Sequence, residues 1–205
     1  MTKKLKTIAI LASGNGSNAE NIVKAVKTRK LKAHIALIFS DKRKAKVLKR
    51  AEKLNIPYVS FEPKDFKSKK EYEKVLIKLL KAEKIDYVVL AGYMQILSKE
   101  FISAYKNRII NIHPSLLPAF KGAEAIKDAY QYGVRVSGAT VHFVVPEVDS
   151  GPIILQKTVE IKKGESLARF EDKIHKAEYE ILPQALRLVL EGKTKLKANK
   201  VTINK

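Results

Sequence analysis

The chain has 205 residues, and 45% of them are hydrophobic, which is enough for the core of one α/β domain. It contains no cysteine, so disulfides, thiolate catalysis and cysteine-ligated metal sites are excluded. No apolar run approaches the length of a membrane span, and charges recur too early for a signal peptide. These features predict a cytoplasmic protein without a membrane partner.

The charge is strongly positive, with 41 Lys and Arg residues against 21 Asp and Glu residues and a net charge of +20. Such a balance favours an anionic partner, either a small phosphorylated substrate or a nucleic acid. However, the lysines are spread over almost every segment, and the chain lacks tryptophan and any nucleic-acid-binding motif. We therefore expect small-molecule substrates, no nucleic acid, and a lysine-rich solvated surface of the kind found in proteins from hot environments.

A glycine-rich turn follows the first predicted strand. The apolar run of residues 7–12 predicts a buried parallel strand, and a helical pattern starts after Asn18. Between them, Gly14 and Gly16 allow the backbone to approach a ligand, and a helix N-terminus favours an anion. Ser17 and Asn18 could cap the helix, donate to a phosphate, or both.

The turn by itself leaves three interpretations open. Residues 14–19 fit the dinucleotide-binding fingerprint with alanine in its last position, and Asp41 follows the second predicted strand, which together suggest a nicotinamide enzyme. The turn could instead hold a monophosphate, or it could be only a tight turn with a helix cap.

Strands and helices alternate through the first 130 residues, which predicts βαβ units. The predicted strands cover residues 35–39, 58–61, 86–91 and 109–112, and two later strands at 136–144 and 153–161 are expected to pair antiparallel. The fold class is therefore α/β, a Rossmann-like, mostly parallel sheet with helices on both faces. A long helix is predicted over residues 166–190, kinked or restarted at Pro183. We expect one domain over residues 1–205.

Two polar side chains share one face at the end of the strand near residue 110. The strand must end at Pro114, which cannot donate to a sheet ladder. Asn111 and His113 are two residues apart, so their side chains project in the same direction. An amide donor beside an imidazole is suited to stabilising an oxyanion, whereas a lone histidine there would be structural.

The loop after the strand at 86–91 is apolar for a segment at the carboxyl edge of a sheet. Its residues Met94, Ile96 and Leu97 could wall a slot for a flat heterocycle, or pack as a buried connection.

Four further acidic or imidazole groups need an interpretation. Asp149 lies in the turn Asp149-Ser150-Gly151-Pro152, where it could be catalytic or could form an Asx turn. We favour a structural or supporting role for His142. His175 and Glu178 are one helical turn apart, but no further ligands accompany them, so we predict no metal site.

The stretch Asn111-Ile112-His113-Pro114-Ser115-Leu116-Leu117-Pro118 resembles the formyltransferase family that uses 10-formyltetrahydrofolate as co-substrate. The resemblance extends from about residue 8 to about residue 190 and includes the D-x-G-P motif at Asp149. In particular, the chain is similar to members that formylate glycinamide ribonucleotide, N1-(5-phospho-D-ribosyl)glycinamide, in purine (IMP) biosynthesis.

This resemblance implies a role for each candidate residue. Asn111 and His113 would donate hydrogen bonds to the developing oxyanion, and the carboxylate of Asp149 would favour the protonated imidazole of His113 and accept the amine proton through water. The N-terminal half would bind the phosphate, and the C-terminal half would bind folate and carry catalysis. The implied ribonucleotide-binding residues are Gly16, Ser17, Asn18 and Glu178, with Glu178 near the amine. The implied folate-binding residues are Asn111, Met94, Gln95, Ile96, Leu97 and Lys69, where the family has an arginine.

Three alternatives remain at this point. A formyltetrahydrofolate hydrolase would share Asn111, His113 and Asp149 but use water as acceptor, and it resembles this family with an added N-terminal regulatory domain. Methionyl-tRNA formyltransferase shares a similar S-L-L-P segment but carries a further C-terminal domain. A nicotinamide-nucleotide-binding protein would explain the glycine-rich turn but gives residues 111–118 no role. We expect a monomer or homodimer.

Overall fold

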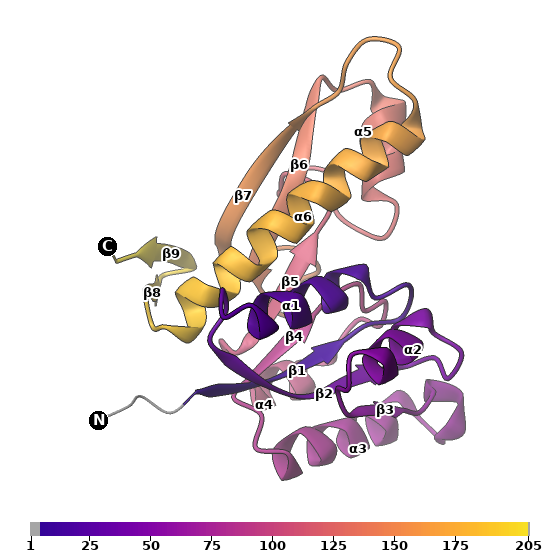
Figure 1. The fold of residues 1–205 in the computed structure, drawn as a ribbon, viewed down its shortest axis with the longest axis vertical. Helices are drawn as coiled ribbons and strands as arrows, with labels where there is room; N and C mark the ends of the chain where they lie inside the picture. The colour runs from indigo at the N-terminus through magenta and orange to yellow at the C-terminus, as the bar shows by residue number, and fades with distance from the viewer. Residues whose placement is uncertain (1–4, 205) are drawn as a thin grey trace. The chain divides into compact units, whose positions relative to one another are not determined.

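The computed structural model describes residues 5–204 (Figure 1). The elements in chain order are β1 (Lys6–Leu11), α1 (Ser17–Lys27), β2 (Ala33–Ser40), α2 (Lys46–Lys53), β3 (Tyr58–Ser60), the 3₁₀ turn η1 (Pro63–Asp65), α3 (Lys69–Ala82), β4 (Tyr87–Leu90), α4 (Lys99–Ala104), β5 (Ile109–His113), α5 (Ala125–Tyr132), β6 (Val136–Phe143), β7 (Ile153–Glu160), α6 (Leu167–Leu190), β8 (Thr194–Lys197) and β9 (Lys200–Ile203).

Seven strands form one sheet in the order β3-β2-β1-β4-β5-β6-β7. The strand β1 pairs in parallel with β2 and β4, and β2 pairs in parallel with β3. The late strands β6 and β7 pair antiparallel. The predicted fold class, a mostly parallel sheet with an antiparallel pair in the C-terminal part, is confirmed. The separate two-stranded sheet of β8 and β9 was not predicted.

The chain divides into two compact units, one over Met1–Ile110 and the other over Asn111–Lys205. The division falls within β5, so the strand that carries Asn111 and His113 begins in unit 1 and ends in unit 2. The expectation of one domain over residues 1–205 stays a prediction.

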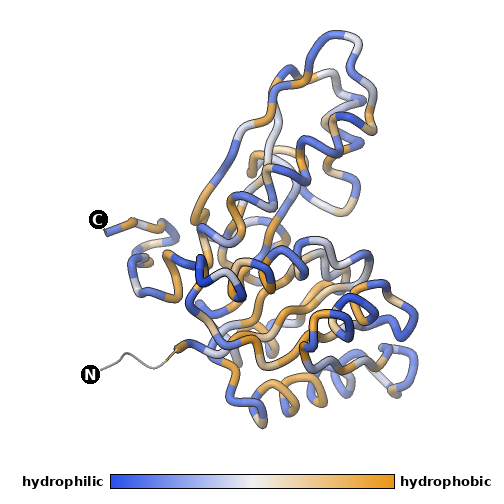
Figure 2. The backbone as a smooth tube through the Cα atoms, viewed as in Figure 1, coloured by the Kyte–Doolittle hydropathy of each residue, from blue (hydrophilic) through white to orange (hydrophobic). Residues whose placement is uncertain are grey.

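In unit 1, the buried strands form an apolar layer between helices. The side chains of Ile8, Ile10 and Leu11 in β1 are fully buried, and Figure 2 shows the hydrophobic strands of this unit. Right-handed crossovers place α1 and α2 on one face of the sheet and α3 and α4 on the other, and Figure 1 shows α1 and α3 on opposite sides. The turn after β1 and the loop after β4 meet at the carboxyl edge, where the amide of Ser13 donates to the carbonyl of Gly92 at 2.9 Å.

In unit 2, the helix α6 packs along β6 and β7, and α5 packs against α6. The helix does not restart at Pro183, because α6 is one continuous helix from Leu167 to Leu190, and a kink there stays a prediction. A proline inside a helix costs about 3 kcal/mol. Burial of its neighbours Leu182 and Leu186, at about 1.5–3 kcal/mol each, offsets that cost.

Serine side chains cap α3 and α4, whereas α1 has no side-chain cap. The hydroxyls of Ser68 and Ser98 accept hydrogen bonds from the amides of Glu71 and Phe101. By contrast, neither Ser17 nor Asn18 caps α1, because its N-cap residue is Gly16, which has no side chain to bond. Glycine is required there because φ is 75° and a Cβ atom would lie 2.3 Å from Cγ2 of Val47 in α2.

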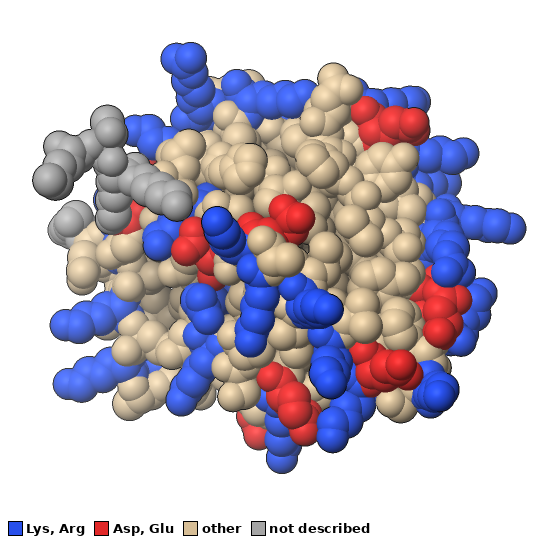
Figure 3. Space-filling view, turned by 90° about the horizontal axis from the view of Figure 1, so that it is seen from below, with Lys and Arg blue, Asp and Glu red and all other residues tan. Residues whose placement is uncertain are grey.

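On the face drawn in Figure 3, basic side chains are not confined to one patch. Figure 3 shows Lys and Arg side chains spread over one face of the molecule, with Asp and Glu side chains among them. Within residues 5–204, no helix is long and apolar enough to cross a bilayer.

The strands β6 and β7 approach each other closely at Gly138. A Cβ atom on this residue would lie 2.0 Å from the carbonyl oxygen of Lys157 and 2.7 Å from the side chain of Leu116. Both contacts are shorter than van der Waals distance, and the first is to backbone, which cannot rotate away. Only glycine therefore fits at this register position of the antiparallel pair.

We predict that Gly138→Ala lowers the free energy of unfolding by about 1–3 kcal/mol, because the added methyl group forces the two strands apart. Urea denaturation followed by circular dichroism measures the change. Gly14→Ala is the matched control, since a Cβ atom there meets nothing within 4 Å. Equal unfolding midpoints for the two variants would contradict the prediction.

Candidate active site

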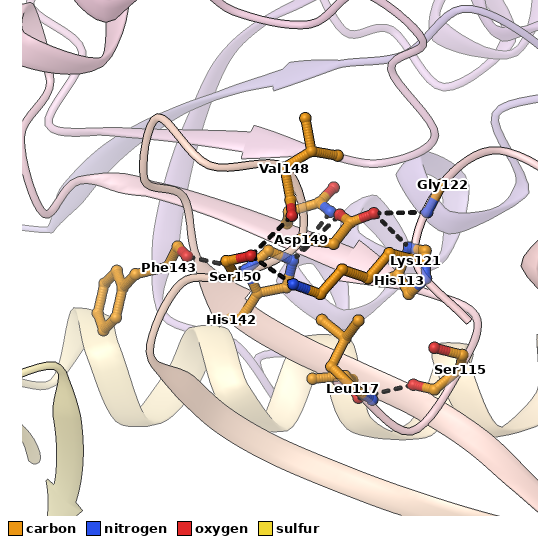
Figure 4. Close-up of polar contacts among 12 residues, drawn as sticks. His113, Ser115, Leu117, Lys121, Gly122, His142, Phe143, Val148, Asp149 and Ser150 are labelled. Carbon is orange, nitrogen blue, oxygen red and sulfur yellow. Dashed lines mark hydrogen bonds and ion pairs between the residues drawn. The ribbon is translucent and has the colours of Figure 1, made fainter. Parts of the chain in front are cut away.

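The end of β5 presents two polar side chains in unit 2. Asn111 is half-buried and His113 is only 5% exposed, and the strand ends at His113, directly before Pro114. Two more polar residues of the same unit join them, His142 from β6 and Asp149 from the turn before β7 (Figure 4 shows the two histidines and Asp149). The structure thus brings together the three predicted catalytic residues, Asn111, His113 and Asp149, around one further histidine.

His113 lies between two acceptors. Its Nε2 donates to the carbonyl oxygen of Phe120 at 2.8 Å, and its Nδ1 lies 3.4 Å from Oδ2 of Asp149. Both ring nitrogens therefore face oxygen atoms that accept hydrogen bonds, one of a backbone carbonyl and the other of a carboxylate.

His142 fixes the orientation of Asn111. The Nδ1 atom of His142 lies 2.8 Å from the carbonyl oxygen of Phe143, which can only accept, so Nδ1 carries the proton. Burial lowers the pKa of this imidazole below its ordinary value of 6.5, against the raising effects of the Phe143 hydrogen bond and Asp149. The neutral ring leaves Nε2 as an acceptor, and Nδ2 of Asn111 donates to it at 3.1 Å. The second N–H of the Asn111 amide is available for another acceptor.

Asp149 has a strained backbone and a bonded carboxylate. Its φ is 47°, in the left-handed region that aspartate tolerates better than most residues. The Oδ2 atom accepts from the amide of Gly122 at 2.9 Å, and Oδ1 lies 3.8 Å from Nε2 of His142. The carboxylate is thus directed at both histidines, and the bond that stabilises the local turn comes instead from Ser150, whose hydroxyl donates to the carbonyl of Val148 at 2.9 Å.

Residues 120–122 contact this cluster, and Figure 4 shows Lys121 and Gly122 bonded to Ser150 and Asp149. Besides the Phe120 carbonyl and the Gly122 amide, Nζ of Lys121 donates to the hydroxyl of Ser150 at 2.6 Å. These contacts were not predicted, since two of the three are made by backbone groups, whose partners no residue type reveals. The structural or supporting role expected for His142 agrees with its hydrogen bond to Asn111.

A hydrogen-bond network holds the loop that follows β5. The hydroxyl of Thr140 donates to the carbonyl of Ser115 at 2.6 Å and accepts from the amide of Leu117 at 3.1 Å. The side-chain amide of Gln156 donates to the carbonyl of Leu117 at 2.9 Å. Strands β6 and β7 therefore fix the start of the loop that carries residues 120–122.

The predicted ribonucleotide-binding turn belongs to unit 1. Gly16 ends the turn, Ser17 opens α1, and Asn18 is buried in the first turn of that helix. The dinucleotide interpretation needed the carboxylate of Asp41 for a ribose. That residue is only 2% exposed, and its Oδ2 accepts from Nε2 of Gln95 at 2.8 Å, so its arrangement does not favour ribose binding.

The predicted folate-binding loop also belongs to unit 1. The side chains of Met94 and Ile96 are 59% and 62% exposed, whereas Leu97 is buried. The loop is held by Gln95 through Asp41 and by the amide of Met94, which donates to the hydroxyl of Ser13 at 2.8 Å. Two large apolar side chains are thus presented to solvent by a fixed backbone. Lys69, the first residue of α3, is also exposed.

Glu178 lies in α6 of unit 2, where its side chain is almost fully buried and accepts from Nδ1 of His175 at 2.9 Å. This hydrogen bond raises the pKa of the His175 imidazole, whereas burial lowers it. The charges of Glu178, Glu171 and Asp172 also raise it. Among residues 5–204, no three His, Cys, Asp or Glu side chains are grouped as a metal site would require.

The fold and this cluster define a class of protein. Residues 6–186 match the family model described as formyl transferase, and the chain belongs to that family.

Two relatives are similar in sequence over more than nine-tenths of this chain. The chain is 44% identical over 186 residues to the phosphoribosylglycinamide formyltransferase of Bacillus subtilis (strain 168), covering 91% of this chain and 95% of that protein. It is 39% identical to the human trifunctional purine biosynthetic protein adenosine-3, covering 96% of this chain but 20% of that protein.

Two solved structures are similar in fold to this chain over nearly its whole length. The crystal structure of glycinamide ribonucleotide transformylase 1 from Symbiobacterium toebii matches with a TM-score of 0.96 and 37% identity, over 98% of this chain and 95% of that one. A formyltetrahydrofolate deformylase from Pseudomonas syringae pv. tomato matches with a TM-score of 0.92 and 30% identity, over 98% of this chain and 67% of that one.

We predict opposite pKa shifts for the two histidines that the environment perturbs. His142 should titrate below 6.5 and His175 above it, because burial disfavours a charged His142 while Glu178 favours a charged His175. At pH 7, His142 should also carry its proton on Nδ1. Nitrogen-15 NMR of the imidazole rings across a pH titration measures both quantities, with His142→Gln and His175→Asn assigning the signals. A cationic His142 at pH 7 would contradict the tautomer derived above.

Proposed function

We propose that the chain transfers the formyl group of 10-formyltetrahydrofolate to the amino group of N1-(5-phospho-D-ribosyl)glycinamide, a step of purine biosynthesis. The observation that carries this proposal is the Asn111 amide, oriented by His142, beside an imidazole held between Asp149 and a carbonyl. The cluster offers what formyl transfer needs, namely donors for an oxyanion, a proton source for the leaving nitrogen and a base for the attacking amine.

The reaction forms a bond between the amine nitrogen and the formyl carbon and breaks the bond from that carbon to the folate nitrogen. Asn111 donates its second N–H to the formyl oxygen, on which negative charge develops. His113 donates to the same oxygen and passes its proton to the leaving nitrogen, and Asp149 takes the proton of the attacking amine through water. Because Nε2 of His113 now donates to the carbonyl of Phe120, the substrate must replace that carbonyl before His113 can act.

The proposed binding residues are those that the resemblance implies. In unit 1, Gly16, Ser17 and Asn18 hold the phosphate of the ribonucleotide, and Met94, Gln95, Ile96 and Leu97, with Lys69, bind the folate. In unit 2, Asn111 contributes to the folate site, and Glu178 lies near the amine end of the ribonucleotide. A cytoplasmic location and a monomeric or homodimeric state complete the proposal.

The strongest second candidate is hydrolysis of 10-formyltetrahydrofolate, because a deformylase has the same fold and the catalytic cluster would serve water as well as an amine. A product assay separates the two. Purified protein is incubated with 10-formyltetrahydrofolate, with and without the glycinamide ribonucleotide, and the products are identified by mass spectrometry. Formylated ribonucleotide that appears only with both substrates supports the proposal, whereas formate released equally without the amine supports a hydrolase.

We predict that Asn111→Ala and His113→Ala each lower kcat at least about a hundredfold, since loss of one oxyanion donor costs about 2.7–4 kcal/mol of barrier. Initial rates of formylated product measure the effect, and the melting temperature should change little. His34→Ala, which removes an exposed histidine of β2, is the control and should keep wild-type rates. A His113→Ala variant that fails to fold would indicate a structural role instead.

A further inference from the structure

A residue of α2 forms hydrogen bonds to the glycine-rich turn of unit 1. The guanidinium of Arg50 donates from Nε to the carbonyl oxygen of Asn15 at 2.8 Å and from Nη2 to Oδ1 of the same residue at 3.1 Å. Its third nitrogen, Nη1, pairs with the carboxylate of Glu20 in α1. One side chain therefore joins α2, the turn and the first turn of α1.

A second bond from α2 acts on the preceding peptide. The amide of Val47 donates to the carbonyl oxygen of Gly14 at 3.1 Å. Two consecutive carbonyls of the turn, those of Gly14 and Asn15, thus both accept hydrogen bonds from α2. The contact between Gly16 and Val47, which leaves no room for a Cβ atom, keeps the turn and α2 pressed together.

These two bonds determine the direction of the following amides. In a planar trans peptide, the C=O and the N–H of one unit point in opposite directions. When the carbonyls of Gly14 and Asn15 face α2, the N–H groups of Asn15 and Gly16 must point away from it. In the sequence they directly precede the first amides of α1, which have no partner within the helix and favour an anion.

From this geometry we propose that Arg50 is a positioning residue for binding of the ribonucleotide phosphate. It turns the Asn15–Gly16 peptide so that its N–H, with the amides of residues 15 and 17, is directed at the anion. Arg50 itself does not contact the substrate in this proposal. The inference rests on the proposed function, because it assigns the turn to the phosphate of that substrate.

Position 50 requires the planar guanidinium of arginine, called its fork below. The three acceptors, a carbonyl, an amide oxygen and a carboxylate, are spread around one planar guanidinium, and each is served by a different nitrogen. A lysine has one nitrogen at the end of a flexible chain and cannot hold all three in a fixed plane. Its charge would nevertheless be kept, so Arg50→Lys separates orientation of the turn from simple attraction of an anion.

The test compares Arg50→Lys with Arg43→Lys, in steady-state kinetics of formyl transfer. Arg43 is the matched control, because its guanidinium makes a two-pronged contact with Asp65 at 2.7 and 3.1 Å and does not bond to the turn. We expect Arg50→Lys to raise KM for the ribonucleotide about tenfold. The KM for 10-formyltetrahydrofolate should be unchanged, and kcat should fall less than about threefold. Arg43→Lys should match the wild type in all three constants.

Two kinetic results would overturn the inference. Wild-type KM values in Arg50→Lys would mean that the fork is not needed, and an equal rise in both KM values would mean a general loss of structure. If Arg50→Lys melts well below Arg43→Lys, Asn15→Ala decides instead. This variant removes the Oδ1 acceptor and keeps Arg50. The inference then requires that the KM for the ribonucleotide rises by less than in Arg50→Lys, while the KM for 10-formyltetrahydrofolate stays unchanged.

Binding of ribose 5-phosphate, measured by isothermal titration calorimetry, keeps this inference distinct from the proposed function. If wild-type protein forms no formylated product but binds ribose 5-phosphate, and Arg50→Lys binds it about tenfold more weakly, the reaction assignment is wrong and the role of Arg50 stands. If the wild type binds neither ribose 5-phosphate nor the ribonucleotide, the inference is wrong.

Discussion

A strand buried in a sheet must pair its backbone groups, and β5 ends where Pro114 has no N–H to offer. This constraint fixes His113 as the last residue of the strand and Asn111 as its neighbour on the same face. The chain then leaves the sheet, and Thr140 and Gln156 bind the first residues of the loop. The position of residues 120–122 beside the histidines depends on where the chain leaves the sheet. That point is set by Pro114, which has no N–H to continue the strand.

Much of the fold could be predicted because unit 1 alternates strands and helices along the chain. Continuous apolar runs such as residues 7–12 indicate strands buried on both faces, and Ser68 and Ser98 mark helix starts by a local hydrogen bond. The local sequence predicts less where tertiary packing decides. Gly16 replaces a side-chain cap because Val47 presses on the turn, and α6 passes through Pro183 because buried residues flank it. The β8 and β9 hairpin carries only weak alternation in a strongly basic tail.

The site was predictable in its side chains but not in its backbone. The spacing of Asn111 and His113 gave their common direction, and the resemblance brought Asp149 to them. Alternation says little about His142, because β6 is buried on both faces from Ser137 to Phe143. The carbonyl of Phe120 and the amide of Gly122 belong to a residue with φ of 50° and to a glycine, conformations that only the folded loop explains.

The contacts of residues 120–122 have a thermodynamic consequence for any ligand of this cluster. The imidazole of His113 and the carboxylate of Asp149 are already hydrogen-bonded by the protein's own backbone. A ligand that reaches them exchanges one set of polar contacts for another, and such an exchange yields little net free energy. Affinity must then come mainly from surfaces away from the reacting atoms, while the polar cluster distinguishes the correct ligand from those that cannot replace a carbonyl and an amide together.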